Sequence, residues 1–108
     1  MSENDNYGPH SVELLKTDVF DRWLTELRDA RGAARVQARL DRLAIGNPGD
    51  VKSVGEGVVE MRIDYGPGYR VYYTRRGMLV IVLLCGGNKS TQVKDIARAK
   101  QMAQALKE

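Results

Sequence analysis

The chain of 108 residues has a single cysteine, Cys85, and a single histidine, His10. One cysteine excludes an internal disulfide, and a lone cysteine within an apolar run is usually a small buried hydrophobic residue. No group of histidine, cysteine and acidic residues has the spacing of a metal site, and the Gly-rich phosphate-binding fingerprints are absent. We therefore expect no metal and no cofactor.

Long apolar segments are also lacking. The longest run, Met78–Cys85, is too short to cross a bilayer. The opening stretch, MSENDNYGPHS, has no apolar core of the kind found in signal peptides. We expect a cytoplasmic protein with no membrane partner. The length fits a single domain over residues 12–108, preceded by a flexible polar tail over residues 1–11.

The positive charge is concentrated in the second half of the chain. Residues 11–49 carry six acidic and seven basic residues, whereas residues 50–108 carry six acidic and ten basic residues. A basic surface of this kind favours a polyanionic partner.

Two apolar stripes with helical periodicity lie in the first half. The first stripe is interrupted at Arg31–Gly32 and the second ends before Gly46, so the pattern predicts two helices packed as an antiparallel hairpin. The stripes consist of Phe20, Trp23, Leu24 and Leu27, and of Ala33, Val36, Leu40, Leu43 and Ala44. The second is flanked by Arg35, Arg39 and Arg42, which are either solvated side chains or a surface for an acidic partner.

Strand patterns dominate the second half. Val59–Ile63 and Tyr69–Thr74 alternate apolar and polar residues, as half-buried strands do. The run Met78–Cys85 predicts a central strand that is covered on both faces. A short first strand at Val12–Leu15 and a last helix from Ser90 complete the order. The pattern predicts an α+β fold, in which an N-terminal helical hairpin packs on a mainly antiparallel sheet of four to five strands, followed by a C-terminal helix.

The register of the hairpin between Val59–Ile63 and Tyr69–Thr74 can be predicted. If the apolar faces of both strands coincide, Met61 pairs with Val71, and Arg62 lies opposite Arg70 on the other face. Two adjacent arginines repel unless an anion lies between them. Two interpretations remain open: an ion-pair cluster with Glu60 or Asp64, or a phosphate clamp.

The segment GGNKST, residues 86–91, contains a third basic candidate. Lys89 follows the predicted central strand, and two bare glycines would let a ligand approach the backbone closely. Ser90 or Thr91 is expected to cap the next helix, whose N-terminal amides favour an anion. Lys89 should then converge with Arg62 and Arg70 at one edge of the sheet, unless it is only a solvated loop lysine.

The segments VEMRIDYGPGYRVYYTRRG and LLCGGNKSTQVKDIARAK, taken together, resemble the addiction-module killer proteins, the HigB-like branch of the RelE/ParE toxin superfamily. The resemblance extends from Val12 to Leu106 and implies a RelE-like fold. Characterised RelE-type members are mRNA interferases, which enter the ribosomal A site and cut the message with basic residues and no metal.

The resemblance also implies roles for individual residues. Arg62 matches the family's catalytic arginine, and Lys89 matches its second basic position. The expected RNA-binding residues are Lys52, Arg70, Tyr72 and Lys94. Tyr72 lies on the same predicted strand face as the arginines, where it is either a structural tyrosine or a ring that stacks on a base. Many interferases have a tyrosine or histidine near the C-terminus, but here no aromatic residue or histidine follows Tyr73. The general base is therefore unassigned, and a lysine of lowered pKa, Lys52 or Lys89, is the available candidate.

The implied function is that of a toxin in a type II toxin–antitoxin module. It would be a ribosome-dependent endoribonuclease that leaves a 2′,3′-cyclic phosphate, and its partners would be the ribosome, mRNA and a cognate antitoxin with a helix-turn-helix. Two alternatives stay open: a ParE-like protein that poisons DNA gyrase by binding, and an inactive relative that only binds its antitoxin.

Overall fold

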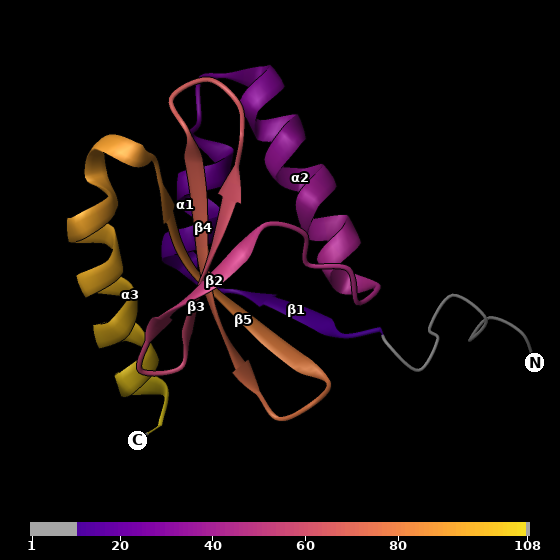
Figure 1. The fold of residues 1–108 in the computed structure, drawn as a ribbon, viewed down its shortest axis with the longest axis vertical. Helices are drawn as coiled ribbons and strands as arrows, with labels where there is room; N and C mark the ends of the chain where they lie inside the picture. Colours follow the sequence, from indigo (N-terminus) through magenta and orange to yellow (C-terminus); the bar gives the residue numbers. More distant parts are fainter. Residues whose placement is uncertain (1–10, 108) are drawn as a thin grey trace, which may run out of the picture.

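A five-stranded sheet with the strand order β1-β5-β4-β3-β2 forms the middle of a computed structural model, which describes residues 11–107 (Figure 1). Strand β1 runs parallel to β5, and the other neighbouring strands are antiparallel. The elements in chain order are β1 (Glu13–Lys16), α1 (Asp18–Thr25), α2 (Ala30–Ala44), β2 (Val51–Gly55), β3 (Val58–Ile63), β4 (Tyr69–Arg76), β5 (Val80–Gly87), the 3₁₀ turn η2 (Lys89–Thr91) and α3 (Gln92–Leu106).

The predicted α+β class and the mainly antiparallel sheet are confirmed, with five strands in a mixed sheet. The middle strand is β4, whereas the apolar run predicted to be central forms β5, between β1 and β4. The predicted strand also begins two residues before the observed one, at Met78 instead of Val80. Met78 and Leu79 lie in the turn before β5, where they are 86% and 64% exposed. His10 and nearly all of the predicted tail lie outside the described residues.

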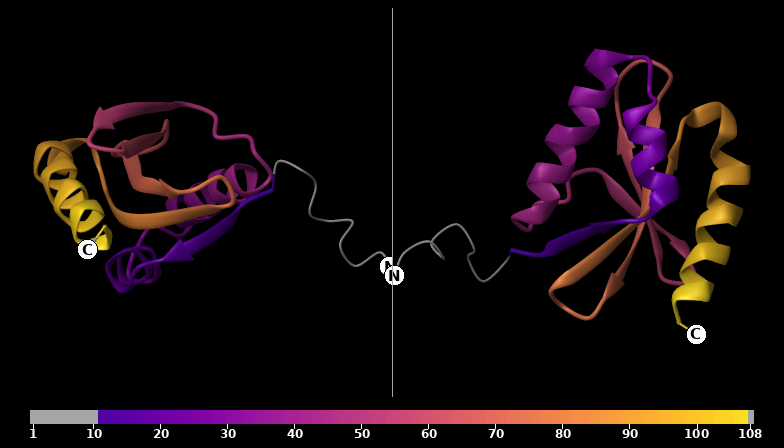
Figure 2. Two further views of the ribbon diagram at one scale, coloured as in Figure 1. Left: turned by 90° about the horizontal axis from the view of Figure 1, so that it is seen from below. Right: turned by 180° about the vertical axis from the view of Figure 1, so that it is seen from behind.

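The helices cover both faces of the sheet (Figure 2). Helices α1 and α2 pack on one face, and α3 packs on the other. The first core consists of Phe20, Val36, Leu40, Leu43, Met61, Ile63, Tyr69, Val71, Tyr73, Ile81 and Leu83. The second consists of Val58, Tyr72, Val82, Leu84, Cys85, Ala99 and Ala103. The strands alternate between the two cores, because successive side chains of a strand point to opposite faces.

The boundary between the two N-terminal helices differs from the prediction. Helix α1 ends at Thr25, and α2 begins at Ala30, so Arg31 and Gly32 lie inside the second helix rather than between the two. Asp29 caps α2, because its carboxylate accepts a hydrogen bond from the Gly32 backbone N–H at 2.9 Å. Its second oxygen accepts a hydrogen bond from the Tyr69 hydroxyl at 2.8 Å. Gly32 is required where a helix former would be expected, because the buried Tyr69 ring packs directly against it.

We predict that Gly32→Ala destabilises the protein by about 1–3 kcal/mol through overpacking. A Cβ at this position would lie 2.5 Å from Cε2 of Tyr69. An exposed helical glycine behaves in the opposite way, because alanine there stabilises a helix by roughly 0.5–1 kcal/mol. Urea unfolding measures the change, and Ala34→Gly on the exposed side of α2 is the control for helix propensity. A Gly32→Ala variant more stable than the parent would contradict this packing.

Candidate functional site

A row of side chains crosses the sheet on the face that α3 partly covers. Arg62 on β3 pairs with Arg70 on β4, and Arg70 pairs with Gly87 on β5. Met61 pairs with Val71 on the other face, so the predicted hairpin register is confirmed. The backbone N–H of Arg62 donates to the carbonyl of Asp50, the residue just before β2, at 3.0 Å. This row therefore begins with an acidic residue and continues with two arginines.

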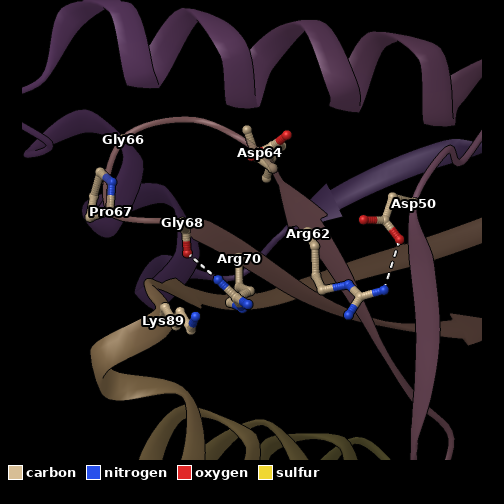
Figure 3. Close-up of a pocket in the computed structure, with 9 residues that line it drawn as sticks. Asp50, Arg62, Asp64, Gly66, Pro67, Gly68, Arg70 and Lys89 are labelled. Carbon is tan, nitrogen blue, oxygen red and sulfur yellow. Dashed lines mark hydrogen bonds and ion pairs between the residues drawn. The ribbon is translucent and has the colours of Figure 1, made fainter.

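An open cleft of about 570 Å³ lies over this row (Figure 3). The three basic side chains that the sequence singled out, Arg62, Arg70 and Lys89, all contribute to its wall. The remaining lining residues are Asp50, Ile63, Asp64, Gly66, Pro67 and Gly68. The loop between β3 and β4 thus forms one rim of a cationic cleft.

Arg62 forms an ion pair with Asp50, which was not among the predicted site residues. Its Nη2 atom donates to Oδ1 of Asp50 at 3.0 Å, and the two side chains are 40% and 57% exposed. The expected partners were Glu60 or Asp64. The register explains the difference, because Asp50 lies next to Arg62 across the β2–β3 ladder. An exposed pair of this kind contributes little to stability, so Arg62 remains available to a stronger anion.

Arg70 is held more rigidly, because its side chain is only 12% exposed. It donates to the Gly68 carbonyl, and its Nε lies 3.9 Å from Oε2 of Glu60. Glu60 is completely buried, and the same oxygen accepts from the Tyr72 hydroxyl at 2.9 Å and from Gln92 Nε2 at 2.7 Å. A buried carboxylate needs such partners, and it fixes the arginine in front of it.

Part of the hydrogen-bonding capacity of this cluster is unused. The Nε atoms of Arg62 and Arg70 and the Oε1 atom of Glu60 are buried, and none of them has a hydrogen-bond partner among residues 11–107. Buried polar atoms are nearly always paired in folded proteins, so unpaired ones concentrated beside a cleft indicate a place where function outweighs stability.

Tyr72 does not present its ring to a ligand. The residue is fully buried, and its side chain belongs to the core beneath α3. Burial, and then the hydrogen bond to Glu60, raise the pKa of Tyr72 above the ordinary tyrosine value. The hydroxyl therefore stays protonated and serves as a donor to Glu60, so of the two interpretations of Tyr72 the structural one fits its burial.

Gly86 and Gly87 do not leave the backbone open, contrary to the prediction. A Cβ at Gly86 would lie 2.3 Å from the Trp23 ring, and one at Gly87 would collide with the Asp95 carboxylate. The space beside each glycine is thus filled by a side chain of the protein, Trp23 on one face of β5 and Asp95 on the other. They allow α1 and α3 to pack closely on the sheet, and they form no anion cradle.

Lys89 is exposed at the start of the turn η2. Thr91 occupies the predicted N-cap position of α3, but its side chain makes no cap hydrogen bond there. Asn88 caps the turn η2, where its side chain accepts from the Ser90 N–H at 2.9 Å. The backbone N–H of Lys89 donates to the Pro67 carbonyl at 3.3 Å, which joins this turn to the β3–β4 loop. Lys89 is therefore placed by its backbone, while its ammonium group faces the cleft (Figure 3).

Two other expected RNA-binding residues lie outside the cleft. Lys52 pairs with Glu60 in the β2–β3 ladder and is exposed, but it does not line the cleft wall. Lys94 is exposed on the first turn of α3 and, together with Lys89, borders a neighbouring hollow of about 450 Å³. The structure thus divides the predicted basic residues into a central group of three and two peripheral lysines.

Arg39 supports the site from behind. Its guanidinium donates to the carbonyls of Arg62 at 2.6 Å, Pro48 at 3.0 Å and Asp50 at 3.4 Å. It therefore ties α2 to β3, which carries Arg62, and to the segment before β2, which carries Asp50. Arg35 lies 4.8 Å from the Tyr65 ring centre. The expected outward-facing stripe of three arginines is therefore wrong for Arg39, which faces the backbone.

Other chemistry has little support in the described part of the chain. Among residues 11–107, no three His, Cys, Asp or Glu side chains are grouped to hold a metal ion. Burial raises the pKa of the Cys85 thiol to about 12, so the thiol stays neutral. None of the helices in residues 11–107 is long and apolar enough to cross a membrane.

Comparisons with known proteins agree with a toxin-like protein of phage origin. A family model described as phage-derived protein Gp49-like (DUF891) matches residues 22–108, which include the whole cleft. An uncharacterized protein from Haemophilus influenzae is 49% identical over 96 residues, which cover 89% of this chain and 97% of that protein.

We predict that Tyr72→Phe lowers the free energy of unfolding by about 1–3 kcal/mol, because the buried Glu60 carboxylate loses a donor. The neighbouring Tyr73→Phe is the matched control. Tyr73 is also buried, but its hydroxyl has no hydrogen bond to a described residue, so its loss should change stability by less than about 0.5 kcal/mol.

The pH dependence of the unfolding free energy tests the Tyr72–Glu60 hydrogen bond a second time. A tyrosine whose pKa is raised on folding contributes stability that is complete below its unfolded pKa of about 10 and declines above it. The difference in stability between the parent and Tyr72→Phe should therefore narrow as the pH rises through this value. If Tyr72→Phe and Tyr73→Phe were equally stable at neutral pH, the role of Tyr72 as a stabilising donor to Glu60 would be contradicted.

Proposed function

The chain belongs to the Gp49-like family of phage-derived proteins, a RelE/Gp49 toxin-like family, and from this premise we propose that it is the toxin of a type II toxin–antitoxin module that cuts mRNA on the ribosome. The proposal includes a RelE-like fold of the HigB-like branch, a cytoplasmic site of action, and a cognate antitoxin with a helix-turn-helix. The observation that carries the proposal is the convergence of Arg62, Arg70 and Lys89 in one open cleft.

The cleft suits a phosphodiester better than a neutral ligand. Arg62 and Arg70 are paired on neighbouring strands and both line the cleft, and a planar guanidinium matches the oxygens of a phosphate. One of them is fixed by buried partners, and the other is paired only with an exposed carboxylate. An entering phosphate could thus be oriented by Arg70 and could also bind to the exposed side of Arg62.

RNA supplies its own nucleophile for cleavage at such a site. The 2′-hydroxyl attacks the adjacent phosphorus, and the transition state carries more negative charge on the phosphoryl oxygens than the ground state. Cations fixed before the reaction stabilise that additional charge without reorganising. Arg62 and Lys89 are the two groups that we assign to this stabilisation, with Arg70 as a binding residue.

A cleft that is open and lined by few apolar groups fits a substrate presented by a larger assembly. Asp50, Asp64, Gly66 and Pro67 on its rim are all exposed. The net charge of +3 and the peripheral lysines Lys52 and Lys94 would add attraction to a polyanion. The ribosome would hold the message extended across the cleft, and the protein itself need enclose only one phosphate.

Expression of the protein without its antitoxin should arrest growth by stopping translation. Pulse labelling of protein and DNA synthesis after induction measures which process stops first. The proposal expects protein synthesis to fall first, together with cleaved messages. Early loss of DNA synthesis with intact messages would instead favour a gyrase poison, and unaffected growth would indicate an inactive relative.

We predict that Arg62→Ala and Lys89→Ala each slow cleavage by about a hundredfold to a thousandfold, the usual effect of removing one preorganised charge. Both side chains are exposed enough that stability should change by less than about 0.5 kcal/mol. Primer extension on cleaved message measures the rate, and thermal melting checks the fold.

Met61→Ala is the control from the opposite face of β3. Met61 is fully buried, so its truncation should destabilise the protein by about 2–5 kcal/mol through a cavity. An Arg62→Ala variant that melts like the parent and cuts at the parental rate would refute the assigned role of Arg62.

A further inference from the structure

The cleft contains two carboxylates in addition to its three cations. Asp50 and Asp64 both line it, and both are exposed. Among the described lining residues, these carboxylates and Lys89 are the only side chains that could accept a proton from a sugar hydroxyl, because arginine stays protonated in proteins. The candidates for a general base are therefore few.

Geometry distinguishes between these candidates. In a displacement at phosphorus, the attacking and leaving oxygens lie roughly in line on opposite sides of the phosphorus. The group that takes the proton from the nucleophile and the group that gives a proton to the leaving oxygen must then lie on opposite sides of the phosphate. The phosphate itself should lie against Arg62 and Arg70.

Asp50 and Lys89 satisfy this requirement. In Figure 3 they lie at opposite ends of the cleft, with the side chains of Arg62 and Arg70 between them. Asp64 lies to one side of this row, and its carboxylate points away from the two arginines. The arrangement thus places one proton acceptor and one proton donor at the two ends of a phosphate-binding pair.

We propose that Asp50 is the general base of the cleavage reaction and that Lys89 is its general acid; this assignment depends on the function proposed above. Asp50 is suited to the task because only one of its oxygens is occupied. Oδ1 accepts the hydrogen bond from Arg62, and Oδ2 accepts none from a described residue. Arg62 therefore orients the base while its own charge faces the phosphate.

The proposed step balances in protons and electrons. Oδ2 of Asp50 takes the proton of the 2′-hydroxyl as a lone pair of that oxygen forms the bond to phosphorus. The bond from phosphorus to the 5′-oxygen breaks, and that oxygen keeps the electron pair and receives a proton from Nζ of Lys89. The products are a 2′,3′-cyclic phosphate and a 5′-hydroxyl, and exchange with water restores Asp50 and Lys89.

Among the described residues, the charged groups around Asp50 are mainly cations. Arg62 on β3 contacts its carboxylate, and Arg39 on α2 contacts its backbone carbonyl. Arg70 and Lys89 line the same cleft, with Asp64 as the one other acid there.

The test is single-turnover cleavage of a message on programmed ribosomes by the purified protein and by Asp50→Asn. Asparagine keeps the shape of aspartate and an oxygen for Arg62, but it is not a base. We expect a loss of about 10²–10⁴-fold in the cleavage rate, the usual range for a general base, with unchanged or tighter ribosome binding. Asp64→Asn changes the other carboxylate of the cleft in the same way and should lose much less of the rate than Asp50→Asn, and thermal melting checks that all three proteins are folded.

The pH profile separates a carboxylate base from a lysine base. A carboxyl group ordinarily titrates near about pH 4 and an alkylammonium group near about 10. With Asp50 as the base, the parental rate should stay level from about pH 6 to 9. With a lysine base the rate would rise with pH in this range, by about tenfold per pH unit below the pKa of that lysine.

Three results would overturn the assignment alone: an Asp50→Asn variant that cuts at the parental rate, an equal loss in Asp64→Asn, or a parental rate that rises with pH as a lysine base requires. A parent protein that binds programmed ribosomes but cuts no message would overturn the proposed function, and the assignment with it.

Discussion

The pairing of β3 with β4 places Arg62 directly beside Arg70, and the rest of the site depends on this repulsive contact. Like charges at opposed positions of a sheet are unfavourable, so each arginine needs an acidic partner. Asp50 forms an exposed ion pair with Arg62, and the buried Glu60 forms an ion pair with Arg70 from the interior. The two partners differ in burial, so Arg62 is exposed to a ligand whereas the side chain of Arg70 is largely enclosed.

Burial of the Glu60 carboxylate is unfavourable, and hydrogen bonds from β4 and α3 offset this cost. Glu60 lies beneath α3, where a carboxylate without hydrogen bonds would be strongly unfavourable. Tyr72 on β4 and Gln92 at the start of α3 both donate to it. The position of α3 is thus tied to the position of Arg70, and the glycines of β5 allow that helix and α1 to approach closely on opposite faces.

The sequence was sufficient for the features that follow from periodicity. The two-residue alternation of β3 and β4 correctly predicted the register, the buried face with Met61 and the meeting of Arg62, Arg70 and Lys89. Long-range contacts were not predictable in this way. Nothing local shows that Trp23 and Asp95 fill the space beside Gly86 and Gly87, that Arg39 turns inward, or that β1 pairs in parallel with β5. The Asp50–Arg62 pair could be predicted only in part. It follows from the β2–β3 register, but only when that register is extended by one residue into the loop before β2.

The central claim is that this cationic cleft promotes attack by the 2′-hydroxyl of RNA on its own phosphodiester. The chemical nature of the new RNA ends tests it most directly. Purified protein would be incubated with ribosomes that carry a defined message, and the fragments would be analysed by mass spectrometry. We expect a 2′,3′-cyclic phosphate on the upstream fragment and a 5′-hydroxyl on the downstream fragment. Intact message, or fragments that end in a 3′-hydroxyl and begin with a 5′-phosphate, would contradict it.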